Sequence, residues 1–186
     1  CHTPPRYYWS HYEEYRKNPG YGKLNPFVRA LMPLLVPKQR KLDLQAASQV
    51  DVFIANSTET QKRIKRYYNR SSMIIYPPVD TKRFTPARNR EDYYVTIGRQ
   101  LPYKRYDLAV QAATKLNKKL IVFGNGPMHE TLVKLAGPTV EFRTNRFGDA
   151  SNAEYEKILN SAAGFIYPAE EDFGIVQAEA LAAGTP

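Results

Sequence analysis

The residues best suited to chemistry in this sequence stand in short loops that follow apolar runs. One such loop, residues 98–105, contains the cations Arg99 and Lys104 directly after Gly98. Arg99 offers a planar fork that can hold a phosphate through two hydrogen bonds, and Lys104 adds a mobile positive charge. Gly98 lets the backbone come close to a ligand. We therefore expect a diphosphate to bind here, with a solvated basic loop as the competing interpretation.

A second loop, residues 167–174, carries three consecutive acids, Glu170, Glu171 and Asp172. Mutual repulsion in a concave site would raise the pKa of such carboxyl groups and destabilise the fold. The tolerated arrangement has one carboxylate facing a hydroxyl-rich ligand while the others point outward. A sugar is such a ligand.

A helix is expected to begin after these acids, opened by Phe173, Gly174 and Ile175. Its free N–H groups and the positive end of its dipole would form an anion site, and Gly174 has no side chain to keep phosphate away. Glu179 follows about five residues into the helix, roughly 7.5 Å along its axis. There its carboxylate could accept hydrogen bonds from a vicinal diol such as ribose, unless it is an ordinary surface residue.

The glycine pair Gly124 and Gly126 resembles half of a dinucleotide-binding fingerprint. His129 occupies the position of the third glycine, and no acidic residue ends a following strand in the expected way. We therefore discount NAD or FAD as a cofactor. The two glycines are interpreted as a tight turn, either against a ligand or within the fold alone.

The elements that must position these loops alternate along the second half of the chain. Strands are predicted at residues 93–97, 119–123, 139–142 and 164–167, and helices over about 106–116, 128–135, 152–161 and 174–183. This alternation indicates an α/β fold, a parallel sheet with helices on both faces. Sheets of this kind bind ligands at the carboxyl ends of their strands, where the loops above are located.

The first half of the chain follows another pattern. Residues 1–37 are rich in Pro and Tyr, which predicts short helices and loops, and a helix is expected over residues 38–49. A strand at 52–55, a helix at 58–69 and a strand at 73–76 complete this half. Because residues 81–92 are polar and charged and contain Pro86, we divide the chain into domains 1–90 and 91–186.

Charge is distributed unevenly over the 186 residues, whose net charge is +9. Residues 1–90 carry 17 Lys or Arg against 6 Asp or Glu, whereas residues 91–186 carry 10 against 12. The basic half suits a polyphosphate ligand, nucleic acid or anionic lipid, and the nearly neutral half argues against a phosphate-backbone groove across the whole surface. Charge by itself does not choose among these partners.

Composition excludes several classes of protein. No apolar run reaches membrane-spanning length and no secretory leader opens the chain, so a cytoplasmic location is expected. Cys1 is the only cysteine, which rules out an internal disulfide and argues against a cysteine-based metal site. The chain starts without Met and stops where another strand is expected. We therefore interpret it as a fragment of a longer protein.

With these loops located, the sequence resembles glycosyltransferase family 4, retaining enzymes of the GT-B fold, in which two Rossmann-like domains face a cleft. The resemblance covers nearly all 186 residues. It depends on Gly98-Arg99 followed by Lys104, on Glu171 and Glu179 around Phe173-Gly174, and on residues 52–57, 76–80, 84 and 184–186. By this resemblance, residues 1–90 are the end of an N-terminal acceptor-side domain with the linker, and residues 91–186 are most of the C-terminal nucleotide-sugar-binding domain.

The resemblance also implies residue roles. Arg99 and Lys104 would hold the donor diphosphate, Glu171 the hydroxyls of the donor sugar and Glu179 the ribose diol. Backbone amides near Phe173 and Gly174 would assist. Transfer would proceed with retention and without a metal ion, cofactor or covalent nucleophile, because the cations stabilise charge on the departing nucleoside diphosphate.

Residues 1–6 resemble a mannosyltransferase-like subgroup whose N-terminal domain carries a His at the cleft edge, facing the donor sugar. His2 is therefore a candidate catalytic residue, with a structural hydrogen-bonding role as its alternative. The subgroup favours a hexose, mannose from GDP-mannose, and a glycan or lipid-linked acceptor. Because family members extend beyond both ends of this sequence, the fragment alone is expected to be inactive.

Three alternatives stay open. The aromatic residues Tyr7, Tyr8, Trp9 and Tyr12 among cations could stack nucleic-acid bases, but no nucleic-acid-binding motif is present, and we expect no such partner. Apolar residues 27–36 beside the basic cluster 38–41 favour peripheral contact with the cytoplasmic membrane face, although Pro33 is expected to interrupt any helix there and burial would explain them equally. A nucleotide-sugar epimerase or a phosphorylase would use the same fold.

Overall fold

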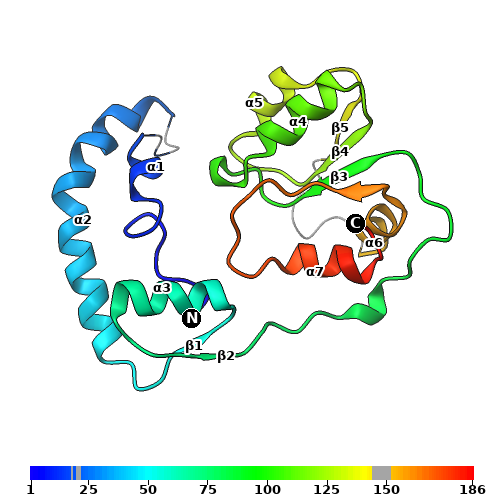
Figure 1. Cartoon of the computed structure of the whole chain (residues 1–186). Coiled ribbons are helices and arrows are strands. Elements are labelled where there is room, and N and C mark those ends of the chain that lie inside the picture. Colours follow the sequence, from blue (N-terminus) through cyan, green and yellow to red (C-terminus); the bar gives the residue numbers. More distant parts are fainter. Residues whose placement is uncertain (18, 20–21, 144–151) are drawn as a thin grey trace. The chain divides into compact units, whose positions relative to one another are not determined.

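The computed structural model describes residues 1–17, 19, 22–143 and 152–186, which form two compact units, Cys1–Pro77 and Pro78–Pro186 (Figure 1). The units divide earlier in the chain than the boundary expected at 90/91. Residues 78–90 belong to the second unit because Phe84 is buried in its core and the Arg90 guanidinium donates to the Ala162 carbonyl at 2.8 Å. Polar composition indicated a linker, but these anchoring residues tie the segment to the second unit.

The second unit is built on a four-stranded parallel sheet in the order β5-β4-β3-β6 (Figure 1). Its strands are β3 (Tyr94–Ile97), β4 (Leu120–Phe123), β5 (Val140–Arg143) and β6 (Gly164–Phe165). Its helices are α4 (Tyr106–Lys115), α5 (His129–Leu135), α6 (Asn152–Ser161) and α7 (Ile175–Ala182), with short 3-10 turns η2 (Thr81–Arg83) and η3 (Pro102–Lys104). The predicted strand–helix alternation is confirmed, and most predicted bounds agree within a residue or two.

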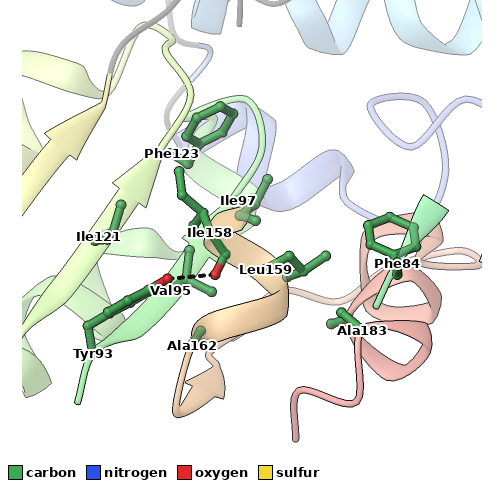
Figure 2. Packing of buried hydrophobic residues seen from close by; sticks show 11 residues of the cluster. Phe84, Tyr93, Val95, Ile97, Ile121, Phe123, Ile158, Leu159, Ala162 and Ala183 are labelled. Carbon is green, nitrogen blue, oxygen red and sulfur yellow. Dashed lines mark hydrogen bonds between the residues drawn. The ribbon is translucent and has the colours of Figure 1, made fainter. Parts of the chain in front are cut away.

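Alternate residues of the strands enter two separate cores. In β4, Leu120 and Val122 pack with α4 and α5, whereas Ile121 and Phe123 pack with α6 and α7. Figure 2 shows the second of these cores, where the Tyr93 hydroxyl donates to the Ile158 carbonyl at 2.9 Å. Helices therefore cover both faces of the sheet, as a parallel sheet requires.

The first unit contains α1 (Tyr12–Lys17), η1 (Gly22–Leu24), α2 (Asn25–Ser48), α3 (Thr58–Tyr68) and two short parallel strands, β1 (Ile54–Ala55) and β2 (Met73–Ile74). The prediction of short helices and loops over residues 1–37 is wrong for the long helix α2, which continues through Pro33 and Pro37. Each proline removes one N–H but keeps a helical φ angle, and buried Val36 and Ala47 anchor the part of the helix that follows Pro33. No helix in the described ranges has both the length and the apolar content needed to cross a membrane.

Polar contacts of α2 fix the N-terminal segment of this unit. The Asp43 carboxylate accepts from Trp9 Nε1 at 2.7 Å and from the Tyr68 hydroxyl at 2.9 Å. The Arg40 guanidinium donates to the Tyr8 carbonyl at 2.6 Å and lies over the Trp9 ring. Of the aromatic residues considered for base stacking, Trp9 thus has structural partners for its side chain, whereas the contact of Tyr8 with Arg40 is made by its backbone carbonyl.

Candidate functional site

The two loops with the predicted site residues lie at one edge of the sheet. Strands β3 and β6 are parallel neighbours, with Tyr94 opposite Gly164 and Val95 opposite Phe165. The loop that follows β3 therefore leaves the sheet beside the loop that follows β6. This edge is formed by the carboxyl ends of the strands, where open α/β sheets bind ligands.

Lys104, Tyr167 and Glu171 meet at this edge in a closed cluster of three side chains. The Lys104 ammonium donates to the Tyr167 hydroxyl and to Glu171 Oε2, and the Tyr167 hydroxyl donates to the same carboxylate oxygen. Only 14% of the Lys104 side chain and 20% of the Glu171 side chain are exposed. The cluster thus places a cation and a carboxylate in direct contact at a site that is partly shielded from water.

The electrostatics of the cluster follow from burial and these contacts. Burial alone would raise the pKa of Glu171, but the hydrogen bonds from Lys104 and Tyr167 outweigh it and lower the pKa below its usual range. Burial, and next the bond to Glu171, raise the pKa of the Tyr167 hydroxyl. Glu171 is therefore held ionised beside a protonated phenol, which can donate a hydrogen bond but not act as a base near neutral pH.

Arg99 and Gly98 lie where the sequence predicted them, directly after β3. The Arg99 side chain is exposed and makes no hydrogen bond or ion pair with another residue in the part of the chain that the structure describes. Gly98 has φ of +142°, and a Cβ there would come within 2.6 Å of the Tyr106 hydroxyl. That hydroxyl donates to the Ile97 carbonyl at 2.7 Å, so the turn leaves no space for a larger residue.

Gln100 is a residue that sequence reasoning missed. It is fully buried, and its side-chain nitrogen donates to the Gly124 carbonyl at 2.7 Å while its oxygen lies 3.0 Å from His129 Nδ1. A Cβ on Gly126 would come within 2.6 Å of the Gln100 carbonyl oxygen. The two glycines of the second loop thus let it pack against the loop that carries Arg99. Of the two interpretations of this turn, close packing within the fold accounts for both glycines.

The N-terminus of α7 has the backbone geometry expected from Gly174. This glycine precedes the helix with φ of +84°, a left-handed conformation that side chains rarely adopt, and Ile175 begins the helix with about half of its surface exposed. The Gln177 side chain lies where a Cβ of Gly174 would be. Phe173 is partly buried in the loop before the helix. Backbone N–H groups are therefore presented next to the cluster-bearing loop, in an arrangement suited to an anion.

Glu179 is a partly buried residue of α7 with a specific partner. The hydroxyl of Tyr155 in α6 donates to Glu179 Oε2, and burial together with this hydrogen bond raises the pKa of Tyr155. Glu179 is therefore not the ordinary exposed surface residue that the alternative interpretation of the sequence described. Its carboxylate is held in one orientation by a residue from a neighbouring helix.

His2 lies in the first unit, separately from the residues above. Its side chain is exposed, and its carbonyl accepts a hydrogen bond from Thr60 Oγ1 at 2.9 Å. The structure thus shows that the backbone of His2 is anchored within the first unit. Its proposed catalytic role stays a prediction.

Tyr167 and Tyr155, like Gln100, were not singled out from the sequence. Tyr167 stood within the predicted acidic loop, so its place before the acids was a usable signal. Gln100 likewise stood within the predicted basic loop, but the roles of Gln100 and Tyr155 depend on residues 24 or more positions away, which the sequence does not reveal. Within the described ranges, no three His, Cys, Asp or Glu side chains gather in a way that could hold a metal ion.

The chain is similar in sequence to proteins of one known family. The sequence model of the family described as "Glycosyl transferases group 1" matches residues 78–186. Among curated proteins, D-inositol 3-phosphate glycosyltransferase of Mycobacterium sp. (strain KMS) is 26% identical over 76% of this chain and 37% of its own length. The same-named protein of Mycobacterium tuberculosis (strain ATCC 25177 / H37Ra) is 25% identical over 76% of this chain and 34% of its own. This chain thus spans little more than a third of these relatives.

Solved structures share the fold. TarM matches with a TM-score of 0.64 and 17% identity, over 80% of this chain and 31% of its own. AviGT4, a glycosyltransferase involved in Avilamycin A biosynthesis, matches with a TM-score of 0.57 and 20% identity, over 72% and 43%. At these identities the likeness concerns the fold alone, and it confirms the α/β, GT-B-type class predicted from the sequence.

Proposed function

Since the chain belongs to the glycosyl transferases group 1 family, we propose that it forms part of a retaining glycosyltransferase. The reaction moves a hexose from a nucleoside-diphosphate sugar to a glycan or lipid-linked acceptor. The observation that carries this proposal is the contact between Lys104 and Glu171 at the carboxyl edge of the sheet. It joins a cation suited to phosphate with a carboxylate suited to sugar hydroxyls.

Each residue of the donor site has a role that its surroundings support. Arg99 is exposed and can turn its guanidinium toward the diphosphate, next to Lys104. Glu171 is held ionised and accepts hydrogen bonds from the sugar, and Glu179 accepts them from the ribose diol. The N–H groups at Gly174 and Ile175 add donors for the phosphate or sugar.

Transfer in this proposal needs no metal ion, because Arg99 and Lys104 supply positive charge where the nucleoside diphosphate departs. Electrostatic stabilisation of that kind is the principal contribution expected when a leaving group gains negative charge. The rate should be unchanged when EDTA is added. Loss of activity in EDTA that Mg²⁺ or Mn²⁺ restores would contradict this part of the proposal.

The favoured donor is GDP-mannose, by the resemblance of residues 1–6 to a mannosyltransferase-like subgroup of the family. Isothermal titration of the full-length protein with GDP, UDP and ADP tests the base, and titration with GDP-mannose tests the sugar. One nucleoside diphosphate should bind clearly more tightly than the others. A preference for UDP or ADP would overturn the GDP assignment and leave the phosphate site in place.

The phosphate site itself is tested by the double variant Arg99→Ala, Lys104→Ala. Each charge-assisted hydrogen bond contributes about 1.5–3 kcal/mol, so the double variant should bind the nucleoside diphosphate at least about a hundredfold more weakly. Lys115→Ala is the control, since Lys115 is an exposed cation of α4. If the double variant bound as tightly as this control, the phosphate site would be elsewhere.

Product analysis separates transfer from the other reactions that this fold could support. Mass spectrometry should detect a glycosylated acceptor after incubation with GDP-mannose and a mixture of glycan and lipid-linked acceptors. An isomerised nucleotide sugar would instead indicate an epimerase. Formation of a sugar 1-phosphate from a glycan and inorganic phosphate would indicate a phosphorylase.

A second proposal, for the first unit, is peripheral contact with the anionic cytoplasmic face of a membrane. The observation that favours it is the continuous helix α2, on which Phe27 near the start and Leu34 and Leu35 farther along are exposed. Residues 15–42 contain seven Lys or Arg and no Asp or Glu. Exposed apolar side chains among cations are suited to an anionic lipid surface. This contact would bring a lipid-linked acceptor to the enzyme.

Flotation of the full-length protein with vesicles tests this contact. Binding should require anionic lipid and should weaken at high salt. The variant Phe27→Ser, Leu34→Ser should bind less, whereas Leu116→Ser, which changes an exposed leucine of the second unit, should bind like the wild type. Equal binding to neutral and anionic vesicles, or no binding, would contradict the proposal.

A further inference from the structure

Tyr167 is the member of the three-residue cluster for which the proposed function gives no role. Its ring stacks on Phe165 with centroids 5.5 Å apart and packs against the core formed by α4, α5 and β4. Its hydroxyl both accepts a hydrogen bond from Lys104 and donates one to Glu171. A partly buried ring thus presents a fixed hydroxyl between two charged side chains that come from different loops.

Without a third group, the two charged side chains would be poorly fixed. Lys104 is a long side chain with three N–H donors, and two of them point to Tyr167 and Glu171. Glu171 belongs to a loop, and its other oxygen accepts a long hydrogen bond of 3.4 Å from the backbone N–H of Asp172. Flexible groups must be ordered before they bind a ligand, and that ordering weakens binding.

We propose that Tyr167 is a positioning residue of the donor site, whose hydroxyl fixes the Lys104 ammonium to the Glu171 carboxylate so that phosphate and sugar are recognised by one preassembled unit. The inference rests on the proposed function, because it takes the phosphate role of Lys104 and the sugar role of Glu171 as given. The new element is that phosphate binding by Lys104 and sugar binding by Glu171 depend on each other through the Tyr167 side chain. The two residues are therefore expected to act jointly.

The surroundings of Glu171 define what a change at Tyr167 would do. The neighbouring titratable groups are Lys104 and Tyr103 of η3, Tyr106 of α4 and Tyr167 itself. Tyr167→Phe keeps the ring and its packing on Phe165 and removes only the hydroxyl. Glu171 then loses one of the two side-chain hydrogen bonds that favour its ionised form, so its pKa rises.

The experiment compares Tyr167→Phe with the wild type in the full-length protein. We expect kcat/KM for the nucleotide sugar to fall roughly tenfold to a hundredfold, the effect of one hydrogen bond to a charged group. The acidic limb of the pH profile of kcat/KM should move to higher pH, because Glu171 must be ionised to accept from sugar hydroxyls. Tyr93→Phe is the matched control, since it removes a buried hydroxyl bond to Ile158 in the other core, and its profile should be that of the wild type.

Two further measurements keep the inference separate from the proposed function. Adding Tyr167→Phe to a Glu171→Gln variant should have little further effect, because the group that Tyr167 positions is already changed. An NMR titration of Glu carboxyl carbons should show a raised pKa of Glu171 in Tyr167→Phe, whether or not transfer is observed.

The outcomes are distinct. An unchanged pH profile and unchanged kcat/KM in Tyr167→Phe would overturn the positioning role while leaving the transferase proposal in place. Additive effects of Tyr167→Phe and Glu171→Gln would overturn it as well. If the wild type bound no nucleoside diphosphate, the proposed function would fail, and with it the role of this cluster in donor binding.

Discussion

Gln100 offers the sharpest test of how the second unit is held together. The variant Gln100→Leu keeps approximate size but removes the amide that donates to the Gly124 carbonyl at 2.7 Å and faces His129 Nδ1 at 3.0 Å. The backbone hydrogen bonds of Gln100 with Asn125 and Met128 stay available. The change therefore isolates the side-chain contribution to the packing of the two loops.

The expected loss of stability depends on whether the two former partners of the Gln100 side chain, the Gly124 carbonyl and His129, can reach water in the variant. The Gly124 carbonyl is in a buried residue, so losing its partner costs about 1–3 kcal/mol, whereas His129 is only partly buried and can turn to water. The leucine side chain offsets part of this lost stability, because it buries more apolar surface than glutamine. We expect the free energy of unfolding of the second unit to fall by about 2 kcal/mol, which is roughly a thirtyfold change in the unfolding equilibrium.

Hydrogen–deuterium exchange of peptides from β3 and β4 is the suitable assay, because the single tryptophan, Trp9, lies in the other unit. Exchange in these strands should accelerate by up to about thirtyfold in Gln100→Leu. Gln111→Leu, at an exposed position of α4, should stay within about 0.5 kcal/mol of the wild type. Equal protection in both variants would refute the argument that Gln100 fastens the two loops.

Three further predictions concern the same unit. Tyr155→Phe removes the hydrogen bond that orients the Glu179 carboxylate. Isothermal titration should show several-fold weaker binding of the nucleoside diphosphate and unchanged binding of pyrophosphate. An equal loss of affinity for both ligands would refute the ribose role of Glu179. Arg90→Ala removes hydrogen bonds to Thr185 Oγ1 at 2.7 Å and to the carbonyls of Asn160, Ala162 and Gly184. Urea titration should show a free energy of unfolding that is lower by about 2–3 kcal/mol, and an unchanged midpoint would contradict this. Folding lowers the pKa of Glu171, so its ionised form adds stability above the unfolded pKa of about 4.3 that is lost as pH falls through the lower folded value. Glu171→Gln should therefore melt lower than the wild type near neutral pH, with a difference that shrinks in acid, and a constant difference would count against this linkage.

The second unit could be predicted from the sequence to a large extent. Apolar runs such as residues 119–123, each followed by a helical pattern, specify strands and helices locally, because the period of burial differs between them. Parallel sheets bring the carboxyl ends of their strands to one edge, so the loops with Arg99 and Glu171 were expected there. The family was suggested by residues at fixed spacing in these same loops.

The first unit was predicted less well, and the physical reason is visible in α2. Proline lacks an N–H, which on local grounds predicts a helix end at Pro33. The helix continues because tertiary contacts at Val36, Asp43 and Ala47 stabilise the part that follows Pro33. Local sequence rules account for the hydrogen bond that a proline removes, but they do not account for the stability that tertiary packing adds to the helix.

In the second unit, the sequence by itself therefore determined the elements, their order and the loops in which the charged residues stand. Only the tertiary structure decided which partners those residues have. Lys104 and Glu171 are 67 positions apart, and they meet because β6 pairs with β3 and not with β5, which precedes it in the chain. Strand order depends on the packing of the whole unit, so no local pattern reveals that one tyrosine hydroxyl joins the two charges.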